Sequence, residues 1–532
     1  MPDIVLATLN AKYIHASFGL RCLRANLGEL RACSALLEFT IGERPLDVAE
    51  RILSFDPRIV ALGVYVWNVA PTTELVTLLK RIRPELVVLL GGPEVSHETE
   101  AQEIVQLADC TIRGEGEAVL PELCRTVLAG GSVPAKIVAA EPPDLATLVL
   151  PYDEYTDDDI AHRLIYVEAS RGCPFSCEFC LSSLDAAVRP YPLEGFLAAM
   201  ERLLARGVRH FKFVDRTFNL HLPTSRRILE FFLARMADGL FLHFEMVPDR
   251  LPPELRELLA RFPAGSLQLE VGIQSFDPEV TAAISRRQEL AKLEDNFRFL
   301  REHTRAHVHA DLIIGLPGET AAGFAAGFDR LVALGPQEIQ VGLLKRLRGA
   351  PIARHTETGA MVYSPVPPYE ILRNRWIDFP TMQRLRRFAR YWDLVGNSGN
   401  FVETLPLFWR GAASPGGAAV GRELGLAGSP VDASPFAEFL AFADWFFAGE
   451  GRHHALALSR TMERVFTILV EGRGLAPAVV AAALVCDCGR IGYLEVPVAV
   501  RPFADRGALA ELAARRGGKA RNTKRQRRHA GA

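Results

Sequence analysis

Short apolar stretches alternate with helical patterns twice along this chain, first in residues 1–135 and again in residues 163–350. In the first series, Ile59–Val66 is an unbroken apolar run, as expected for a strand buried on both faces. Regular strand-helix alternation favours parallel sheets covered by helices. We therefore predict an α/β fold in which residues 1–135 form a doubly wound, Rossmann- or flavodoxin-like parallel sheet.

The second series contains six candidate strands, which fits a partial (β/α)6 barrel of the TIM type over residues 163–350. Residues 136–162 carry several prolines and an acidic run, and they are predicted to be a linker. Residues 351–514 lose the alternation and predict a mostly helical C-terminal domain, in which Val485–Val500 looks strand-like. The barrel strands are expected near Leu164–Ala169, His210–Val214, Phe241–Val247, Leu267–Ile273, His309–Ile314 and Ile339–Leu344.

The formal net charge is −2, but charge is distributed unevenly. Residues 515–532 hold eight Lys or Arg and no acid, which predicts a basic, disordered tail and leaves contact with nucleic acid open. No apolar run approaches the ~20 residues that cross a bilayer. The first residues lack the basic start of a signal peptide. We therefore expect a cytoplasmic protein without a membrane partner.

Three of the nine cysteines, Cys173, Cys177 and Cys180, have C-x3-C-x2-C spacing. Three thiolates on one short loop can each bind one iron of a 4Fe–4S cluster, which leaves the fourth iron open. That iron can chelate S-adenosylmethionine (SAM), and an electron from the cluster can then cleave SAM to a 5′-deoxyadenosyl radical. A structural zinc site is the alternative, but zinc needs four ligands and only the single histidines His162 and His210 are candidates for the fourth.

The barrel region resembles the radical SAM superfamily, in the branch that includes oxygen-independent coproporphyrinogen oxidases and cobalamin-dependent enzymes. The matching segments are RGCPFSCEFC, KFVDRTFN, HFEMVPDRL, LEVGIQSFD, AAISRRQEL and HADLIIGLPGET. The resemblance implies contacts to SAM from strand ends, with Phe179 beside adenine and Gly315 allowing a close backbone approach. Further polar contacts are expected from Asp215, Arg216 and Asn219. The implied SAM contacts are Phe179, Glu245, Gln274, Arg286 (or its neighbour Arg287), Asp311 and Gly315.

The N-terminal domain resembles the cobalamin-binding domain of the same branch, on the segments IVALGVYVWN, VVLLGGPEVS and CTIRGEGEAVLPEL. The D-x-H-x-x-G motif of cobalamin mutases is absent. His15 follows the first strand but lacks the preceding Asp, so a cobalt ligand and a structural histidine both remain open, as does a domain that binds nothing. The implied cobalamin contacts are His15, Gly63, Tyr65, Trp67, Asn68, Gly91, Gly92, Gly114 and Glu115.

Cys486 and Cys488 would share one face of a strand, where they could bind metal, act in redox chemistry or simply pack. The remaining cysteines do not resemble the second cluster site of methylthiotransferases. The C-terminal region resembles an uncharacterised domain often appended to cobalamin-dependent radical enzymes.

These features predict a radical SAM enzyme, in the first instance a cobalamin-dependent methyltransferase acting on an unactivated carbon or phosphorus of an unknown substrate. It would use an electron donor such as flavodoxin or ferredoxin. Rearrangement or cyclisation, nucleic-acid modification through the basic tail, and a non-catalytic cluster or cobalamin sensor are the alternatives.

Overall fold

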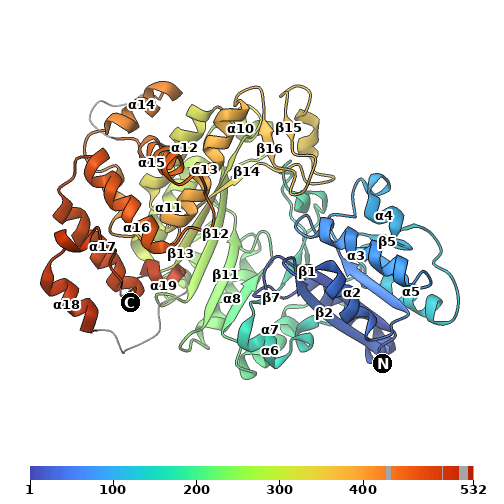
Figure 1. Ribbon diagram of the computed structural model, residues 1–532. Helices are drawn as coiled ribbons and strands as arrows, with labels where there is room; N and C mark the ends of the chain where they lie inside the picture. Colours follow the sequence, from blue (N-terminus) through green and yellow to red (C-terminus); the bar gives the residue numbers. More distant parts are fainter. Residues whose placement is uncertain (427–432, 494, 515–524, 531–532) are drawn as a thin grey trace.

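The computed structural model describes residues 1–426, 433–493, 495–514 and 525–530 (Figure 1). An N-terminal α/β domain, a central half-barrel and a helical C-terminal region follow one another along the chain. The predicted fold class is confirmed. No helix within the described residues is both long and apolar enough to span a bilayer.

The N-terminal sheet has six parallel strands in the order β2-β1-β3-β4-β5-β6. Alternate residues of β1 point to opposite faces, so Ile4 and Leu6 join one apolar cluster while Val5 and Ala7 join the other. Helices therefore cover both faces, as the unbroken apolar runs predict. The strands are β1 (Ile4–Asn10), β2 (Ser34–Thr40), β3 (Ile59–Gly63), β4 (Val87–Gly91), β5 (Cys110–Arg113) and β6 (Ile137–Ala139), and the helices are α1 (Phe18–Ala25), α2 (Pro45–Leu53), α3 (Val69–Ile82), α4 (Glu103–Leu107) and α5 (Val119–Leu128).

The predicted linker, residues 136–162, contains regular secondary structure. Strand β6 lies within it and pairs with β5, so the first sheet extends past residue 135. Helix α6 (Asp157–His162) follows, with a capping box in which Thr156 and Asp159 satisfy each other's backbone N–H groups. Tyr152 and Tyr155 are buried against the barrel. The Tyr155 hydroxyl donates to and accepts from the Tyr166 backbone in the first barrel strand, and the Tyr152 hydroxyl does the same with the Glu168 backbone just after that strand.

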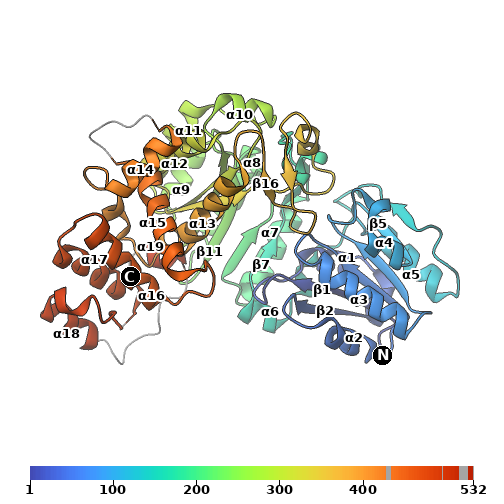
Figure 2. The same ribbon diagram turned by 45° about the horizontal axis from the view of Figure 1, so that its top comes forward.

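The central sheet has six parallel strands in the order β14-β13-β12-β11-β10-β7, which confirms the six predicted barrel strands. Its outer strands β7 and β14 do not pair with each other, so the barrel is open along one side (Figures 1 and 2). The strands are β7 (Ile165–Val167), β10 (His210–Phe213), β11 (Phe241–Met246), β12 (Leu267–Gln274), β13 (His307–Ile314) and β14 (Glu338–Leu343), and the intervening helices are α7 (Leu193–Ala205), α8 (Leu222–Leu233), α9 (Pro253–Ala260), α10 (Pro278–Ala283), α11 (Leu290–His303) and α12 (Ala321–Leu334).

The C-terminal region is mostly helical, as predicted, but the strand expected at Val485–Val500 is wrong. Residues 485–491 belong to helix α17 (Pro477–Ile491), whose preceding alanines favour a helix. Cys486 is exposed and Cys488 is buried, so the two thiols do not share a face. The other elements are β15 (Val362–Tyr363), β16 (Ile371–Arg373), α13 (Phe379–Val395), α14 (Pro415–Leu424), α15 (Pro435–Glu450), α16 (Leu458–Thr467) and α18 (Arg506–Ala514).

The end of the chain departs from the predicted disorder. Residues 525–530 form helix α19 (Arg525–Ala530), which packs against the barrel strand β13, whereas residues 515–524 lie outside the described part of the chain. Gln526 donates to Gln268, and Arg528 donates to Asn400 at 2.9 Å. At least these members of the basic tail are therefore engaged with the protein itself.

A buried carboxylate connects the N-terminal domain to the segment after β14. Glu94 lies after β4, where Arg348 donates to it at 2.9 Å and the Tyr369 hydroxyl donates at 2.6 Å. Glu98 extends the contact by pairing with Arg346 at 2.8 Å. We call Glu94, Arg348 and Tyr369 the domain latch.

We expect Arg348→Met to lower the free energy of unfolding by about 3 kcal/mol, because the buried Glu94 carboxylate then loses its cation. Urea unfolding followed by tryptophan fluorescence measures the change. The matched control is Arg44→Met, which removes the exposed pair to Asp47 and should leave stability unchanged. Equal effects of the two variants would contradict a structural role for the latch.

Candidate functional site

The three cysteines lie on a loop that follows the first barrel strand. The loop is closed at its base by β8 (Ser170–Arg171), which pairs with β9 (Arg189–Pro190), and by the Cys173 N–H, which donates to Asp185 O at 2.9 Å. Gly172 has φ +92°, and a Cβ there would lie 2.1 Å from Ala187 O. Only glycine fits this close backbone approach.

Glu178, between the second and third cysteines, holds the loop from the opposite side. Its buried carboxylate accepts from Arg354 at 2.7 Å, from His355 at 3.0 Å and from the Ser285 hydroxyl at 2.6 Å. The Ile352 N–H donates to its carbonyl at 2.9 Å. Burial raises the pKa of this carboxyl, but these donors outweigh burial and lower it, so Glu178 stays ionised and holds its partners.

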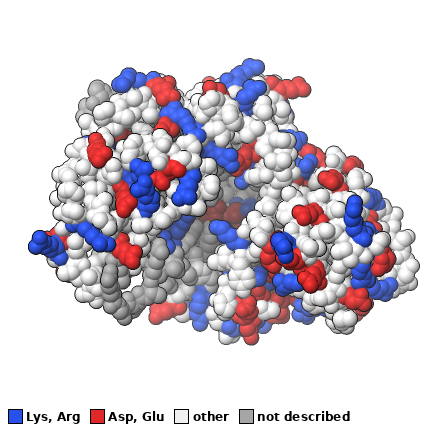
Figure 3. Space-filling model, in the orientation of Figure 1, with Lys and Arg blue, Asp and Glu red and all other residues white. Residues whose placement is uncertain are grey.

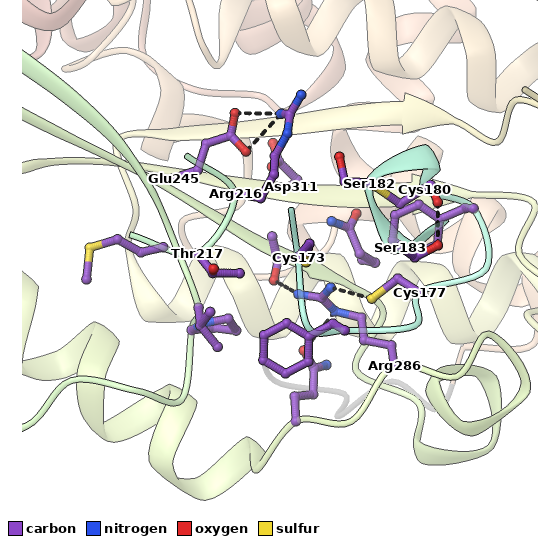
Figure 4. Close-up of a pocket in the computed structure, with 18 of the residues that line it drawn as sticks. Cys173, Cys177, Cys180, Ser182, Ser183, Arg216, Thr217, Glu245, Arg286 and Asp311 are labelled. Carbon is purple, nitrogen blue, oxygen red and sulfur yellow. Dashed lines mark hydrogen bonds and ion pairs between the residues drawn. The ribbon is translucent and has the colours of Figure 1, made fainter. Parts of the chain in front are cut away.

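A cavity of about 170 Å³ opens in front of the loop, and all three cysteines line it (Figure 4). Five of the six residues predicted to contact SAM line the same cavity, because β11, β12, β13 and the cysteine loop all end at this edge of the barrel. Arg287, the alternative to Arg286, lines it too. The five are Phe179, Glu245, Gln274, Arg286 and Asp311.

Two of the three arginines that line this cavity contact other residues of its wall. Arg286 Nη1 lies 3.4 Å from Cys177 Sγ, and its Nη2 donates to Gly272 O (Figure 4). Arg216 pairs with Glu245 at 3.0 Å. Burial raises the pKa of the Glu245 carboxyl and also that of Asp311, so a cationic ligand between them would favour both ionised forms.

Gln274 has a strained backbone at the end of β12. Its φ is +71°, and the pairing with β13 shifts register between Gly272 and Gln274. Its buried Oε1 has no hydrogen-bond partner within the described residues. Strained positions and bulges cluster at binding sites, and an unpaired buried acceptor suits a polar ligand such as SAM.

Three other predicted residues do not face the cavity. Gly315 has φ +89°, and a Cβ there would lie 2.8 Å from Ile371 Cγ2, so its missing side chain makes room for the C-terminal region. Asp215 is buried and accepts from the Ser170 hydroxyl at 2.7 Å, and burial raises its pKa to about 7. Asn219 binds the Val247 backbone through both its donor and its acceptor.

A second cavity, of about 280 Å³, lies at the carboxyl ends of β3, β4 and β5, where doubly wound sheets bind ligands. Apolar side chains form much of its wall, and the glycine-rich strand ends keep it open. It is lined by six of the predicted cobalamin contacts: Gly63, Tyr65, Gly91, Gly92, Gly114 and Glu115.

The other three predicted cobalamin contacts lie elsewhere. His15 and Trp67 line an adjoining cavity of about 390 Å³, together with Tyr65, on which Trp67 stacks with centroids 4.4 Å apart. His15 Nδ1 is 2.7 Å from the Tyr166 hydroxyl, and burial lowers its pKa. Asn68 lines neither cavity, because its amide donates to Leu9 O and Gly63 O and holds the loop.

Arg171 joins the two sites and was not singled out from the sequence. It lines the second cavity, and Cys173, two residues later, lines the first. Its guanidinium pairs with Glu115 at 2.6 Å, Glu117 at 2.8 Å and Glu168 at 2.9 Å. Two features of the sequence could have indicated this role: Arg171 lies two residues before Cys173, and the segment 114–117 (GEGE) supplies two acidic side chains.

No three His, Cys, Asp or Glu side chains are gathered around a single-ion site in the part of the chain that the structure describes. A cubane cluster differs from such a site because each thiolate binds a separate iron. The cavity shared by the three cysteines, the position of Arg286 beside Cys177 and the unpaired Gln274 acceptor therefore fit a cluster with SAM beside it.

Comparison with protein families agrees with this division. Residues 167–330 match the Radical SAM superfamily model, and residues 4–124 match the B12 binding domain model. The chain is a radical SAM protein with a B12-binding domain. These domains imply a 4Fe–4S cluster, SAM and cobalamin as its cofactors. Residues 359–415 match a family of unknown function, DUF4080.

Two relatives that the chain resembles are named as methyltransferases. The chain is 25% identical over 52% of its length to the uncharacterized methyltransferase PH0819 of Pyrococcus horikoshii, covering 64% of that protein. It is 26% identical over 56% of its length to the cobalamin-dependent radical SAM methyltransferase TokK of Streptomyces tokunonensis, covering 48% of it. The matches thus span about half to two thirds of these relatives.

Among solved structures, the cobalamin-dependent SAM radical enzyme OxsB, with aqua-cobalamin and SAM bound, superposes with a TM-score of 0.59 at 13% identity. The match covers 97% of this chain and 84% of that one. At this identity the likeness concerns the fold, and it extends over all three parts of the chain.

We expect Glu178→Ala to raise the rate at which iodoacetamide alkylates Cys177 and Cys180 in metal-free protein about tenfold. Each charge-assisted hydrogen bond lost from the loop is worth about 1.5–3 kcal/mol. Peptide mapping by mass spectrometry measures the rate. Glu194→Ala, which removes an exposed pair to Arg227, is the control. If both variants react at the wild-type rate, Glu178 does not hold the loop.

Proposed function

We propose that this chain is a cobalamin-dependent radical SAM methyltransferase that methylates an unactivated carbon or phosphorus of its substrate. The observation that carries the proposal is the convergence of Cys173, Cys177 and Cys180 with five expected SAM contacts in one cavity, next to the cavity of the B12-binding domain. Arg171, two residues before Cys173, lines the cavity of the B12-binding domain, whereas Cys173 lines the cavity of the cysteine loop.

Each side chain has a distinct part in holding the cofactors. The three thiolates would hold three irons of the cluster, and Arg286, beside Cys177, would hold the SAM carboxylate. Glu245 and Asp311 would accept from the SAM ammonium and ribose hydroxyls. When bound, the cluster supplies the electron that splits SAM, and cobalamin supplies the methyl group. An external donor such as flavodoxin or ferredoxin would reduce the cluster.

The N-terminal domain would position the corrin. The glycines at the ends of β3, β4 and β5 leave space for a large planar ring, and apolar side chains exclude water from its edge. The Tyr65 and Trp67 rings stack on each other at the border of this space: Tyr65 lines both this cavity and the adjoining one, and Trp67, which is 45% exposed, lines the adjoining one. Glu115 is fixed by Arg171 and Arg189, which keeps the cavity mouth in place.

The proposal predicts that Cys177→Ala abolishes both the iron–sulfur signal and 5′-deoxyadenosine formation, because the cluster then lacks one of its three protein ligands. Protein reconstituted anaerobically with iron, sulfide and hydroxocobalamin is assayed with dithionite and SAM, and corrin retained after gel filtration tests the N-terminal site. The exposed Cys486→Ala is the matched control and should keep both signals. A cluster signal that survives replacement of each of the three cysteines would rule the proposal out.

Gly272→Ala should weaken SAM binding about tenfold, a change of about 1.4 kcal/mol. The added Cβ would lie 2.6 Å from Gln274 Nε2 and 3.4 Å from Arg286 Nη2, so both expected contacts must shift. Anaerobic equilibrium dialysis measures the affinity. Gly421→Ala, on α14 with open space around it, is the control. An unchanged affinity in Gly272→Ala would place SAM elsewhere.

A further inference from the structure

The interior of the barrel is unusually polar below the SAM cavity. Barrels of this type normally fill their interior with layers of Val, Ile and Leu. Here the strand register sets Lys212 beside His243, and His243 beside Gln268. His309 and Glu338 are paired in the same way on β13 and β14. These five side chains replace the packed core.

Because these positions are polar, the interior is hollow. A cavity of about 760 Å³ is lined by all five side chains, and its volume lies within the ~300–1,000 Å³ of small-molecule sites. Ile14 of the N-terminal domain and α6 line one side of this cavity. Arg525 and Gln526, which belong to the C-terminal helix α19, also line it. We call this space the barrel chamber.

The chamber borders the SAM cavity through two paired side chains. His243 in the chamber lies 2.8 Å from Glu270, which lines the SAM cavity. His309 in the chamber lies 3.4 Å from Asp311, which also lines the SAM cavity. One layer of side chains therefore separates the chamber from the SAM cavity.

The charge of the chamber wall favours an anion. Its lining contains four Lys or Arg side chains but a single carboxylate, that of Glu338. The molecule is hollowed between its two halves, and side chains of both charges lie along that hollow (Figure 3), so the preference for an anion depends on the residues that line the chamber itself. The four cations are Arg163, Arg209, Lys212 and Arg525.

Two of the four cations are already neutralised. Arg163 pairs with Glu38 at 2.9 Å, and Arg525 pairs with Asp393 at 2.8 Å. Arg209 donates to two backbone carbonyls near the rim. Lys212 has a looser ion pair, with its Nζ 3.8 Å from a Glu270 oxygen that His243 already contacts at 2.8 Å. Its ammonium therefore keeps donors for a ligand.

We propose that the barrel chamber is a binding site for a small molecule carrying a carboxylate or phosphate group, which Lys212 binds. The chamber lies toward the amino ends of the barrel strands, whereas the cysteine loop and the SAM cavity lie at their carboxyl ends. The inference therefore goes beyond the proposed function and assigns a ligand site separate from both cofactor cavities, with the anionic group held on β10. A compact ammonium binds either oxyanion as a point charge.

Anion binding is tested on the anaerobic holoprotein by isothermal titration, with inorganic phosphate in one arm and acetate in the other. We expect Lys212→Met to weaken binding of the preferred anion at least about tenfold, the loss expected of one charge-assisted hydrogen bond, and Lys212→Arg to retain it. Lys292→Met, at an exposed lysine of α11 paired with Glu289, is the matched control and should bind as the wild type does. The arm with the tighter binding identifies the anionic group.

A second measurement on the wild type covers the case in which Lys212→Met does not fold. Bound anion should slow acetylation of Lys212 by an N-hydroxysuccinimide ester, relative to Lys292 in the same sample. The proposal is overturned if neither anion binds, if Lys212→Met binds as well as Lys292→Met, or if the anion does not protect Lys212. Neither readout depends on SAM cleavage, so a failure here is separate from a failure of the methyltransferase proposal.

Discussion

The guanidinium of Arg171 is surrounded by three carboxylates, and the arrangement of the cofactor sites depends on it. Glu115 and Glu117 belong to the N-terminal domain, whereas Glu168 and Arg171 belong to the barrel. The group is largely buried, and a buried cation that loses its partners is strongly unfavourable. The two domains therefore meet where the cysteine loop begins, and the mouth of one cavity is fixed relative to the other.

The carboxyl ends of parallel strands explain why much of the site was predictable. Glu245, Gln274 and Asp311 were expected at successive strand ends, and such ends meet at one edge whatever the details of packing. The cysteine spacing was equally local, because a short loop brings its own ligands together. The glycines of the N-terminal cavity followed from the same rule.

The features that the sequence did not indicate depend on contacts between distant segments or on the length of an element. Gly315 has the backbone expected of a close approach, but what approaches it is Ile371, a residue that no local pattern relates to it. Short apolar runs do not distinguish a strand from a buried helix, so the segment at Cys486 was misassigned. Helix α19 is held by partners such as Gln268 and Asn400, more than a hundred residues away. The polar barrel interior could not be predicted from the sequence either. The alternation of side chains along one strand does not show whether a polar residue faces the barrel interior or the solvent.

At Gln274, the residue type that the left-handed backbone favours differs from the one that supplies a polar side chain to the cavity. A non-glycine residue in that conformation costs of order 1–3 kcal/mol, and glycine would remove the cost. Glycine would also remove the amide side chain, which lines the cavity and whose buried oxygen has no partner within the described residues. Under the proposed function, the residue that would make the fold most stable there is therefore not the residue that would contact SAM, and a search for thermostable variants of this chain would select against that contact.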